Sequence, residues 1–284
     1  MDPLPPLNVP ALLRRYHLHP DKSLGQNFLV DEASLRRIVE AAGISANEAV
    51  LEIGPGLGSL TRHLASRARY VIAVELDGRL IPALQEVLSP LNNIRLVQGD
   101  ILDLSPASLI PDSNYLVVAN IPYYITSALI RHLLEAHPQP GRLVLTVQVE
   151  VAQRICAKPG EMSLLALSVQ VYGQPQVVAH LPAGAFYPPP RVDSAVLRVE
   201  LMPAPRIPSE RLEPFFRLAK AGFSQKRKTL RNALAAGMGW QPAASSDLLH
   251  RAGIDPGRRA ETLSLEEWGE LVIQVEQSAL NDQN

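Results

Sequence analysis

Residues 51–61 read LEIGPGLGSLT, and this stretch decides the fold expected for the first half of the chain. A short apolar run stops at Gly54, and two more glycines follow at Gly56 and Gly58. Glycine lets the backbone turn tightly and approach a ligand closely, and a helix that begins there presents its free N–H groups to that ligand. A dinucleotide fingerprint would place its third glycine at position 59, where this chain has Ser59. We therefore expect a strand, a ligand-binding glycine turn and a helix; the alternative is a purely structural glycine turn.

Strand-like and helix-like segments alternate on both sides of this turn. Short runs rich in Val, Ile and Leu are expected to form strands at 49–53, 70–76, 94–98, 115–119 and 142–147. Helical patterns occupy 57–68, 79–88 and 127–136, and an earlier amphipathic helix is expected between an Asp31 N-cap and Gly43. Nearly continuous apolar strands suit a parallel sheet covered on both faces. The βαβ order therefore predicts a doubly wound α/β sheet.

The pattern changes after the fifth of these strands. Further strands are expected at 168–171, 176–181 and 195–201, including an antiparallel pair at the sheet edge. Residues 202–208 (MPAPRIP) contain three prolines and mark the best domain boundary, because helical patterns dominate beyond them. The predicted organisation is an N-terminal arm at 1–21, an α/β domain at 22–204 and a small all-helical domain at 205–284.

Composition excludes several classes of protein. The chain has 284 residues, of which 46% are hydrophobic, and this content is sufficient for a folded core. No apolar run approaches the ~18 residues that a membrane span needs, and no cationic segment leads into an apolar one as in a secretory signal. Cys156 is the single cysteine and the histidines are scattered, so neither a disulfide framework nor a metal site is expected. A reducing, cytoplasmic setting fits best.

Charge is distributed unevenly although the net charge is only -1. Between Arg206 and Arg231 there are eight basic residues and two acids, whereas six acids and no Lys or Arg occur from Glu261 onward. Such asymmetry is typical of a surface that faces a polyanion. A solvated helix face is the alternative.

Acidic side chains stand where the second and third strands of the series end. Glu75 lies 21 residues after Gly54, and a carboxylate there can accept hydrogen bonds from both hydroxyls of a ribose. Asp100 follows the third strand and can accept from the exocyclic amine of an adenine. A surface glutamate and a helix-capping aspartate are the simpler interpretations. Because open α/β sheets bind ligands at the carboxyl ends of neighbouring strands, the combination favours a nucleoside site.

The fourth strand ends in NIPY, residues 120–123. Turn chemistry alone would explain an Asn and a Pro here. The alternative is a site for an adenine amine, whose lone pair is delocalised into the ring. The Asn120 side-chain oxygen and a backbone carbonyl of Ile121 or Pro122 can bind the two amine hydrogens, with Pro122 holding the backbone in place. Catalysis would then depend on positioning and electrostatics rather than on a strong base.

Two aromatic residues are candidates to hold the base. Tyr123 can stack on it, a contact worth about 1–3 kcal/mol. Phe186 precedes the proline cluster of AFYPPPRVDSAVLRV and can cover the opposite face. A core phenylalanine beside a proline-rich turn is the alternative; together, the two rings would clamp an unstacked adenine.

Eight segments carry a family resemblance. In chain order they are KSLGQNFLVD, LEIGPGLGSLT, IAVELD, QGDILD, NIPYYIT, FYPPPRVDSAVLRV, FSQKRKTLRNAL and RAETLSLEEW. The glycine turn, preceded by Glu52, resembles the first motif of S-adenosylmethionine-dependent methyltransferases. The whole series, from about residue 22 to 268, resembles the bacterial small-subunit (16S) rRNA adenine N(6)-dimethyltransferases.

This resemblance implies a seven-stranded Rossmann-like methyltransferase sheet followed by a small helical domain. It implies S-adenosyl-L-methionine as the cofactor and dimethylation of the exocyclic amines of two adjacent adenosines in the 3′-terminal hairpin of 16S rRNA. The substrate would be a pre-small ribosomal subunit rather than bare RNA. A monomer is expected.

The resemblance also assigns residues. Those expected to contact the cofactor are Gln26, Asn27, Leu29, Gly54, Gly56, Glu75, Leu76, Asp100, Ile101 and Asn120. Those expected to hold the target amine and its base are Asn120, Tyr123 and Phe186. Lys226, Arg227, Lys228 and Arg231 are expected to contact the rRNA backbone, which positions without specifying.

Four other functions compete. A large-subunit rRNA adenine methyltransferase of the macrolide-resistance type shares the strand-end residues, but RKTLRN and RAETLS favour the small-subunit enzyme. A DNA adenine methyltransferase would need a target-recognition insertion that is not evident. A non-catalytic ribosome assembly factor on the same fold would not need an intact cofactor site. A nicotinamide dehydrogenase lacks its third glycine and an evident acid/base for hydride transfer.

Overall fold

The computed structural model describes residues 4–122 and 125–281, and the chain forms two compact units. The first, the α/β unit, is Met1–Ala152 together with Gln174–Leu201. The second, the helical unit, is Gln153–Gly173 together with Met202–Asn284. Each is described by itself below.

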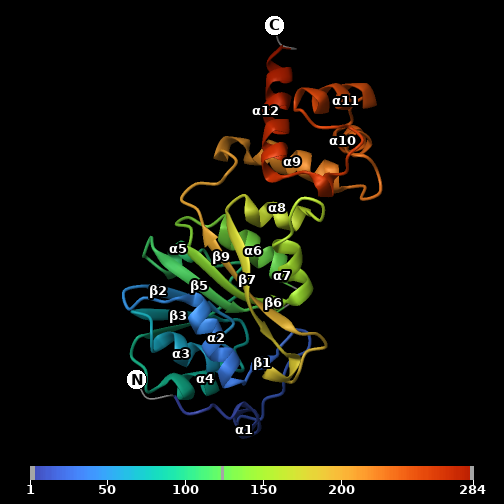
Figure 1. The fold of residues 1–284 in the computed structure, drawn as a ribbon. Coiled ribbons are helices and arrows are strands. Elements are labelled where there is room, and N and C mark those ends of the chain that lie inside the picture. The colour runs from blue at the N-terminus through green and yellow to red at the C-terminus, as the bar shows by residue number, and fades with distance from the viewer. Residues whose placement is uncertain (1–3, 123–124, 282–284) are drawn as a thin grey trace. The chain divides into compact units, whose positions relative to one another are not determined.

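A seven-stranded sheet in the order β4-β3-β2-β5-β6-β9-β7 forms the centre of the α/β unit (Figure 1). Its strands are β2 (Ala49–Ile53), β3 (Tyr70–Glu75), β4 (Ile94–Gln98), β5 (Tyr115–Asn120), β6 (Arg142–Gln148), β7 (Gly173–Leu181) and β9 (Ser194–Leu201). The strands from β4 to β6 are parallel to their neighbours, whereas β9 runs antiparallel to β6. The predicted α/β class and the seven strands are thereby confirmed. The antiparallel pairing of β9 is with β6, inside the sheet, whereas β7 forms the edge.

Helices cover the sheet because its central strands, β2, β3, β5 and β6, are buried on both faces. Those of the α/β unit are α1 (Val9–Arg15), α2 (Glu32–Ala42), α3 (Ser59–Ala65), α4 (Ile81–Leu88), α5 (Pro106–Leu109), α6 (Thr126–Leu134) and α7 (Val149–Ile155), the last continuing into the helical unit. Leu35 of α2 and Leu64 of α3 share one buried cluster with Val50, Val118 and Val144 of the sheet. As predicted, the Asp31 side chain caps α2 and Gly43, with φ of 54°, ends it.

The chain before residue 22 belongs to the α/β unit. Helix α1 buries Val9 and Leu13 in a small cluster with Phe28, Leu57 and Leu80. A second, two-stranded sheet joins β1 (Phe28–Leu29) to β8 (Phe186–Tyr187) in antiparallel register. Residues 28–29 and 186–187, far apart in the sequence, therefore lie side by side.

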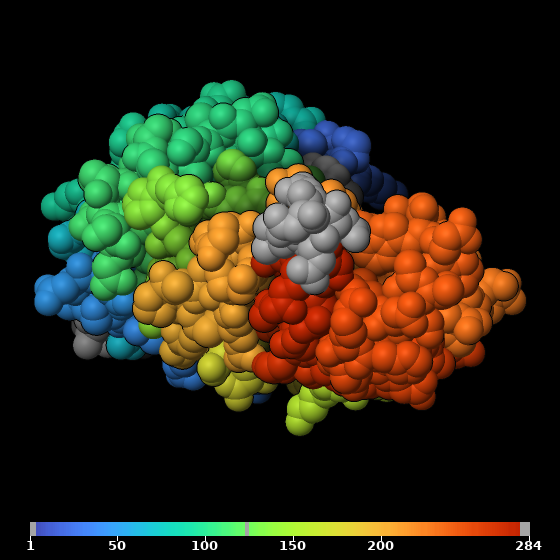
Figure 2. Space-filling view, turned by 90° about the horizontal axis from the view of Figure 1, so that it is seen from above, coloured from blue at the N-terminus to red at the C-terminus, as the bar shows by residue number. Residues whose placement is uncertain are grey.

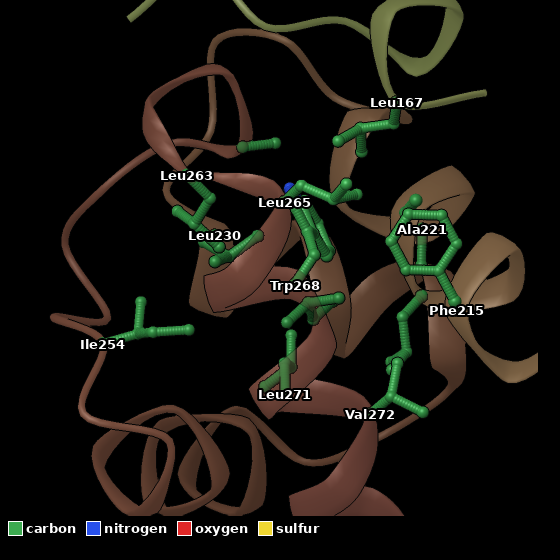
Figure 3. Packing of buried hydrophobic residues seen from close by; sticks show 14 of the residues in the cluster. Leu167, Phe215, Ala221, Leu230, Ile254, Leu263, Leu265, Trp268, Leu271 and Val272 are labelled. Atoms are coloured by element: carbon green, nitrogen blue, oxygen red, sulfur yellow. The ribbon is translucent and has the colours of Figure 1, made fainter. Parts of the chain in front are cut away.

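The helical unit is built around Trp268, which is fully buried (Figure 3). Its helices are α8 (Leu164–Gln170), α9 (Leu212–Phe223), α10 (Leu230–Met238), α11 (Pro242–Arg251) and α12 (Leu265–Asn281). The Trp268 ring stacks on Phe223 with the centroids 5.8 Å apart. Helix α11 packs against both α10 and α12, and the red surface of α12 borders the orange surface of these helices (Figure 2).

The expected strand at 168–171 is wrong, because these residues lie at the end of α8. The Ser163 hydroxyl accepts a hydrogen bond from the Ala166 N–H at 3.1 Å and so caps the helix at its start. Ala166 and Leu167 are buried in the same core as Phe215. This packing places residues 153–173 in the helical unit, whereas the sequence analysis assigned them to the α/β domain.

Candidate active site

A cavity opens at the carboxyl ends of β2, β3 and β5, the edge where the sequence analysis expected a nucleoside site. Eleven of the predicted site residues line it: Gln26, Asn27, Leu29, Gly54, Gly56, Glu75, Leu76, Asp100, Ile101, Asn120 and Phe186. They come from segments up to 160 residues apart, from Gln26 to Phe186. Tyr123 lies outside the described residues.

The glycine turn has the backbone that only glycine adopts without strain. Gly54, Gly56 and Gly58 have φ of 72°, 59° and 86°, all in the left-handed region. A Cβ on Gly56 would stand 2.9 Å from Cδ1 of Phe28, so this position also has no room for a side chain. The turn therefore brings bare backbone against the cavity.

Glu75 links this turn to the end of β3. Its carboxylate accepts hydrogen bonds from the N–H of Gly56 at 2.9 Å and of Asp77 at 2.8 Å, one on each oxygen. The side chain is 6% exposed, and burial raises its pKa above the ordinary value. Since each carboxylate oxygen can accept a further hydrogen bond, the residue fits a diol such as the ribose of S-adenosyl-L-methionine.

The next strand end offers a polar acceptor between apolar surfaces. Asp100 is partly buried, and its Oδ1 accepts from the Leu102 N–H at 2.9 Å, which fixes the side chain. Ile101 is buried, whereas Leu76 is a large apolar side chain that is 45% exposed although it lines the cavity. A flat heterocycle placed there would cover Leu76 and meet an acceptor, which fits the adenine of the same cofactor.

Asn120 ends β5, and its side chain is oriented by the chain opposite. Its Nδ2 donates to the backbone carbonyl of Asn27 at 3.2 Å, so the other end of the amide, Oδ1, is the acceptor. The neighbouring Pro122 carbonyl accepts from the Ile125 N–H at 3.2 Å. The arrangement thus places two acceptor oxygens on consecutive parts of one turn.

Phe186 is buried and lines the same cavity. It pairs with Leu29 across the β1–β8 sheet, so the segment before β1 and the aromatic ring share one support. The following residue, Tyr187, points away from the core and is 41% exposed.

Sequence reasoning gave Glu52 no role, yet it is 1% exposed and lines the cavity. Burial raises its pKa to about 8; the Thr61 hydroxyl acts in the opposite direction, and the charge of Glu75 acts in the same one. Neither Glu52 oxygen has a hydrogen-bond partner of normal geometry within the described residues. The site therefore contains an acid that is neutral at neutral pH.

Sequence patterns did not indicate three further residues beside the cavity, Asp21, Asp77 and Arg79. The Gln26 side-chain amide binds the Asp77 carboxylate and the Asp21 backbone N–H. The carboxylates of Asp21 and Asp77 both pair with Arg79. A signal was present in ELDGR, where Asp77 and Arg79 follow the strand-end glutamate. Nothing in that motif indicates the segment they would meet.

The four predicted RNA contacts belong to the helical unit. Lys226, Arg227 and Lys228 are exposed in the turn between α9 and α10, and Arg231 is exposed on the first turn of α10. The Lys228 N–H donates to the Gln225 carbonyl at 2.9 Å, which closes this turn. Three of the four charges thus lie on a loop, and Arg231 lies on a helix.

Residues 4–122 and 125–281 contain no group of three or more His, Cys, Asp or Glu side chains arranged to hold a metal ion. Among the same residues, no helix combines the length and apolarity needed to cross a membrane.

The fold and the cavity define an S-adenosylmethionine-dependent methyltransferase. Residues 18–277 match the family described as Ribosomal RNA adenine dimethylase. The chain belongs to this family.

Individual relatives agree with this assignment. Ribosomal RNA small subunit methyltransferase A of Dehalococcoides mccartyi (strain CBDB1) is 48% identical over 264 residues, 93% of this chain and 91% of the relative. The protein of the same name from Moorella thermoacetica (strain ATCC 39073 / JCM 9320) is 44% identical over 272 residues, 92% of this chain and 94% of the relative.

Two solved structures are similar over most of the chain. The crystal structure of 23S rRNA methyltransferase ErmE has a TM-score of 0.72 and 31% identity, covering 88% of this chain and 100% of that one. The dimethyladenosine transferase from Plasmodium falciparum has a TM-score of 0.75 and 26% identity, covering 89% and 98%.

Proposed function

We propose that this chain dimethylates the exocyclic amines of two adjacent adenosines in the 3′-terminal hairpin of 16S rRNA. Relatives named as small-subunit methyltransferases, up to 48% identical over nearly the whole chain, support this target. The observation that carries the chemistry is the meeting of Gly54, Glu75, Asp100 and Asn120 around one cavity, each at the end of a neighbouring strand. This set suits a nucleoside cofactor beside a target base. Gly54 provides the turn and Glu75 an acceptor for a diol, while Asp100 and Asn120 each provide an acceptor for an amine.

Within this cavity the chain has two tasks, to hold the cofactor and to aim the target amine. S-adenosyl-L-methionine, when bound, supplies an electrophilic methyl group on a sulfonium. We assign its ribose to Glu75 and its adenine to Asp100, between Leu76 and Ile101. Gly54 and Gly56 let the backbone approach it.

In this proposal Asn120 binds the target amine. Its amide oxygen and a backbone carbonyl of Ile121 or Pro122 accept the two amine hydrogens and direct the nitrogen lone pair at the methyl carbon. As the N–C bond forms and the C–S bond breaks, the nitrogen becomes positively charged and acidic, so one of its protons leaves to water. Catalysis therefore requires alignment and correctly placed acceptors, not a strong base.

Two aromatic rings and four cations complete the proposal. Tyr123 and Phe186 hold the target base, and Lys226, Arg227, Lys228 and Arg231 bind the rRNA backbone. The substrate is a pre-small-subunit particle in the cytoplasm, and the enzyme acts as a monomer. The exposure of the loop cations supports their availability to phosphates.

The test is transfer of labelled methyl from S-adenosyl-L-methionine to small subunits that lack the modification, with large-subunit rRNA and DNA in parallel. We expect dimethyladenosine at two adjacent positions of the small-subunit hairpin alone. Label in large-subunit rRNA would replace the proposal with a resistance-type activity. Cofactor binding without label on any substrate would leave a binding factor. Bare 16S rRNA is the control for the particle requirement.

A further inference from the structure

The wall of the cavity formed by residues 24–27 comes from an irregular segment between α1 and β1. Turns occupy this part of the chain, so no ladder of strand or helix hydrogen bonds holds it over the cavity. Its position must therefore depend on particular side chains. The strongest candidate is Gln26.

Both ends of the Gln26 amide are engaged. Its Nε2 donates to Asp77 Oδ2 at 2.8 Å, and its Oε1 accepts from the Asp21 N–H at 2.8 Å. The Gln26 N–H also donates to the Asp21 carbonyl at 3.1 Å, which closes the turn between these two residues. One side chain thus ties the turn together and attaches it to the end of β3.

Asp77 is a well-fixed anchor for this attachment. It is 7% exposed, and Arg79 grips it through Nε at 2.8 Å and through Nη2 at 2.7 Å, one contact on each carboxylate oxygen. The same Nη2 lies 2.9 Å from Asp21 Oδ2, so Arg79 bridges both acids. A bidentate arginine contact restricts the carboxylate more than a point charge would.

The anchor is continuous with the ribose carboxylate. The Asp77 N–H donates to Glu75 Oε1, while the Gly56 N–H donates to Glu75 Oε2. Hydrogen bonds therefore run without a break from the glycine turn through Glu75 and Asp77 to Gln26.

We propose that Asp21, Gln26, Asp77 and Arg79, here the Asp77 network, are positioning residues that close residues 21–27 over the cofactor cavity. The network sets cofactor affinity by keeping the closed wall populated before the cofactor arrives. This inference rests on the proposed function only in taking the ligand to be S-adenosyl-L-methionine.

If the wall is closed in only a fraction of the molecules, the apparent affinity for the cofactor falls in proportion to that fraction, whereas saturating cofactor restores the closed state. For Asp77→Asn we expect the dissociation constant for S-adenosylhomocysteine, measured by calorimetry without RNA, to rise about 10- to 100-fold, and kcat at saturating cofactor to stay within about threefold. Arg79→Lys keeps the positive charge but loses the two-point contact of the guanidinium with the Asp77 carboxylate, so we expect a smaller rise in the dissociation constant.

Hydrogen exchange gives a readout independent of activity. Amides of residues 21–27 should exchange faster in free Asp77→Asn than in the free wild type, and saturating S-adenosylhomocysteine should restore their protection. The control is Asp112→Asn, which removes the acid of another Arg–Asp pair in the same unit. The two arginines are similarly exposed, 48% for Arg69 and 55% for Arg79, whereas the Asp112 side chain is 27% exposed and that of Asp77 is 6% exposed. It should leave both affinity and exchange of 21–27 unchanged.

A double-mutant cycle separates positioning from direct contact. If Asp77 acts through Gln26, combining Gln26→Ala with Asp77→Asn should raise the dissociation constant little beyond the larger single effect. Fully additive effects, or wild-type affinity and exchange in Asp77→Asn, would overturn the proposal. Failure of the rRNA assay with these binding results intact would instead count against the proposed function alone.

Discussion

Asn120 and Asn27 are 93 residues apart in sequence, yet the Asn120 side-chain amide donates to the Asn27 backbone carbonyl at 3.2 Å. The contact fixes which end of the amide faces the chain and which end remains an acceptor. A single interaction thus orients the proposed amine-binding oxygen and joins it to the wall that covers the cofactor.

Replacing Asn120 by Ala should remove the methyl-transfer activity with little effect on folding. Loss of one preorganised hydrogen-bonding group at a reacting centre typically lowers kcat about 10²- to 10³-fold. Asn120→Asp keeps an acceptor oxygen but loses the donor to the Asn27 carbonyl, so its kcat should lie between those of the wild type and Asn120→Ala. Rates of labelled methyl transfer at saturating cofactor measure this; wild-type kcat in Asn120→Ala would remove Asn120 from the mechanism.

Glu52 should make stability fall as pH rises. Its pKa is about 8 in the folded chain and about 4.5 as an ordinary glutamate, so the folded state holds the proton more tightly than the unfolded state. The associated stability is complete below about pH 4.5 and is lost as pH rises through about 8.

Glu52→Gln removes this titration while retaining the shape of the neutral acid. Melting temperatures of wild type and variant, measured from pH 5 to pH 9 without cofactor, should therefore diverge, with the variant gaining steadily relative to wild type from about pH 5 to about pH 8 and gaining no further above that. Parallel curves would show that Glu52 is ionised in the folded chain.

Gly222 of α9 should not accept even one methyl group. A Cβ there would stand 2.5 Å from Cη2 of Trp268 and 3.2 Å from Cδ1 of Leu230, inside the core shown in Figure 3. Overpacking costs about 1–3 kcal/mol, which exceeds the ~1 kcal/mol that Ala gains over Gly in a helix. Gly222→Ala should therefore lower the free energy of unfolding in a urea titration.

The control for this substitution is Gly184→Ala, since nothing lies within 4 Å of a Cβ at that position. We expect Gly184→Ala to be close to neutral. A stabilised Gly222→Ala would mean that the Trp268 ring moves aside at little cost.

Cations of the loop between α9 and α10 should contribute to rRNA affinity through phosphates. Replacing Lys226, Arg227, Lys228 or Arg231 by Gln, one at a time, should weaken binding and reduce the slope of log affinity against log salt by about 0.7–0.9 each. Arg211→Gln is the control, because Glu276 already pairs with that guanidinium at 2.9 Å. An unchanged slope in a loop variant would remove that residue from the interface.

The sheet could be predicted from sequence because its strands are continuous apolar runs. The expected bounds of β2 and β4 agree with the structure, and that of β5 differs only by Asn120. The failure at 168–171 had a local and a tertiary cause. Ser-Val-Gln-Val suits a strand, but the Ser163 cap starts a helix ahead of it and the buried Ala166 packs that helix into the core. Tertiary packing outweighed the β-branched residues.

The cavity was predictable only where a residue stands at a strand end. Glu75, Asp100 and Asn120 can be aligned in this way because neighbouring parallel strands share an edge. The contact of Gln26 with Asp77 spans 51 residues and begins in an irregular turn, so no periodicity announces it. Likewise β1 has two residues, too few for any pattern to reveal its pairing with β8.

The pairing of Leu29 with Phe186 has a consequence for synthesis of the chain itself. A nascent chain released as far as β6 already holds the glycine turn and the strand ends, but it has no partner for β1. The wall beside the cavity is completed only when Tyr187 has emerged from the exit tunnel. An enzyme proposed to act on ribosomes therefore obtains this part of its cavity wall late in its own translation, after more than two-thirds of its 284 residues have been joined.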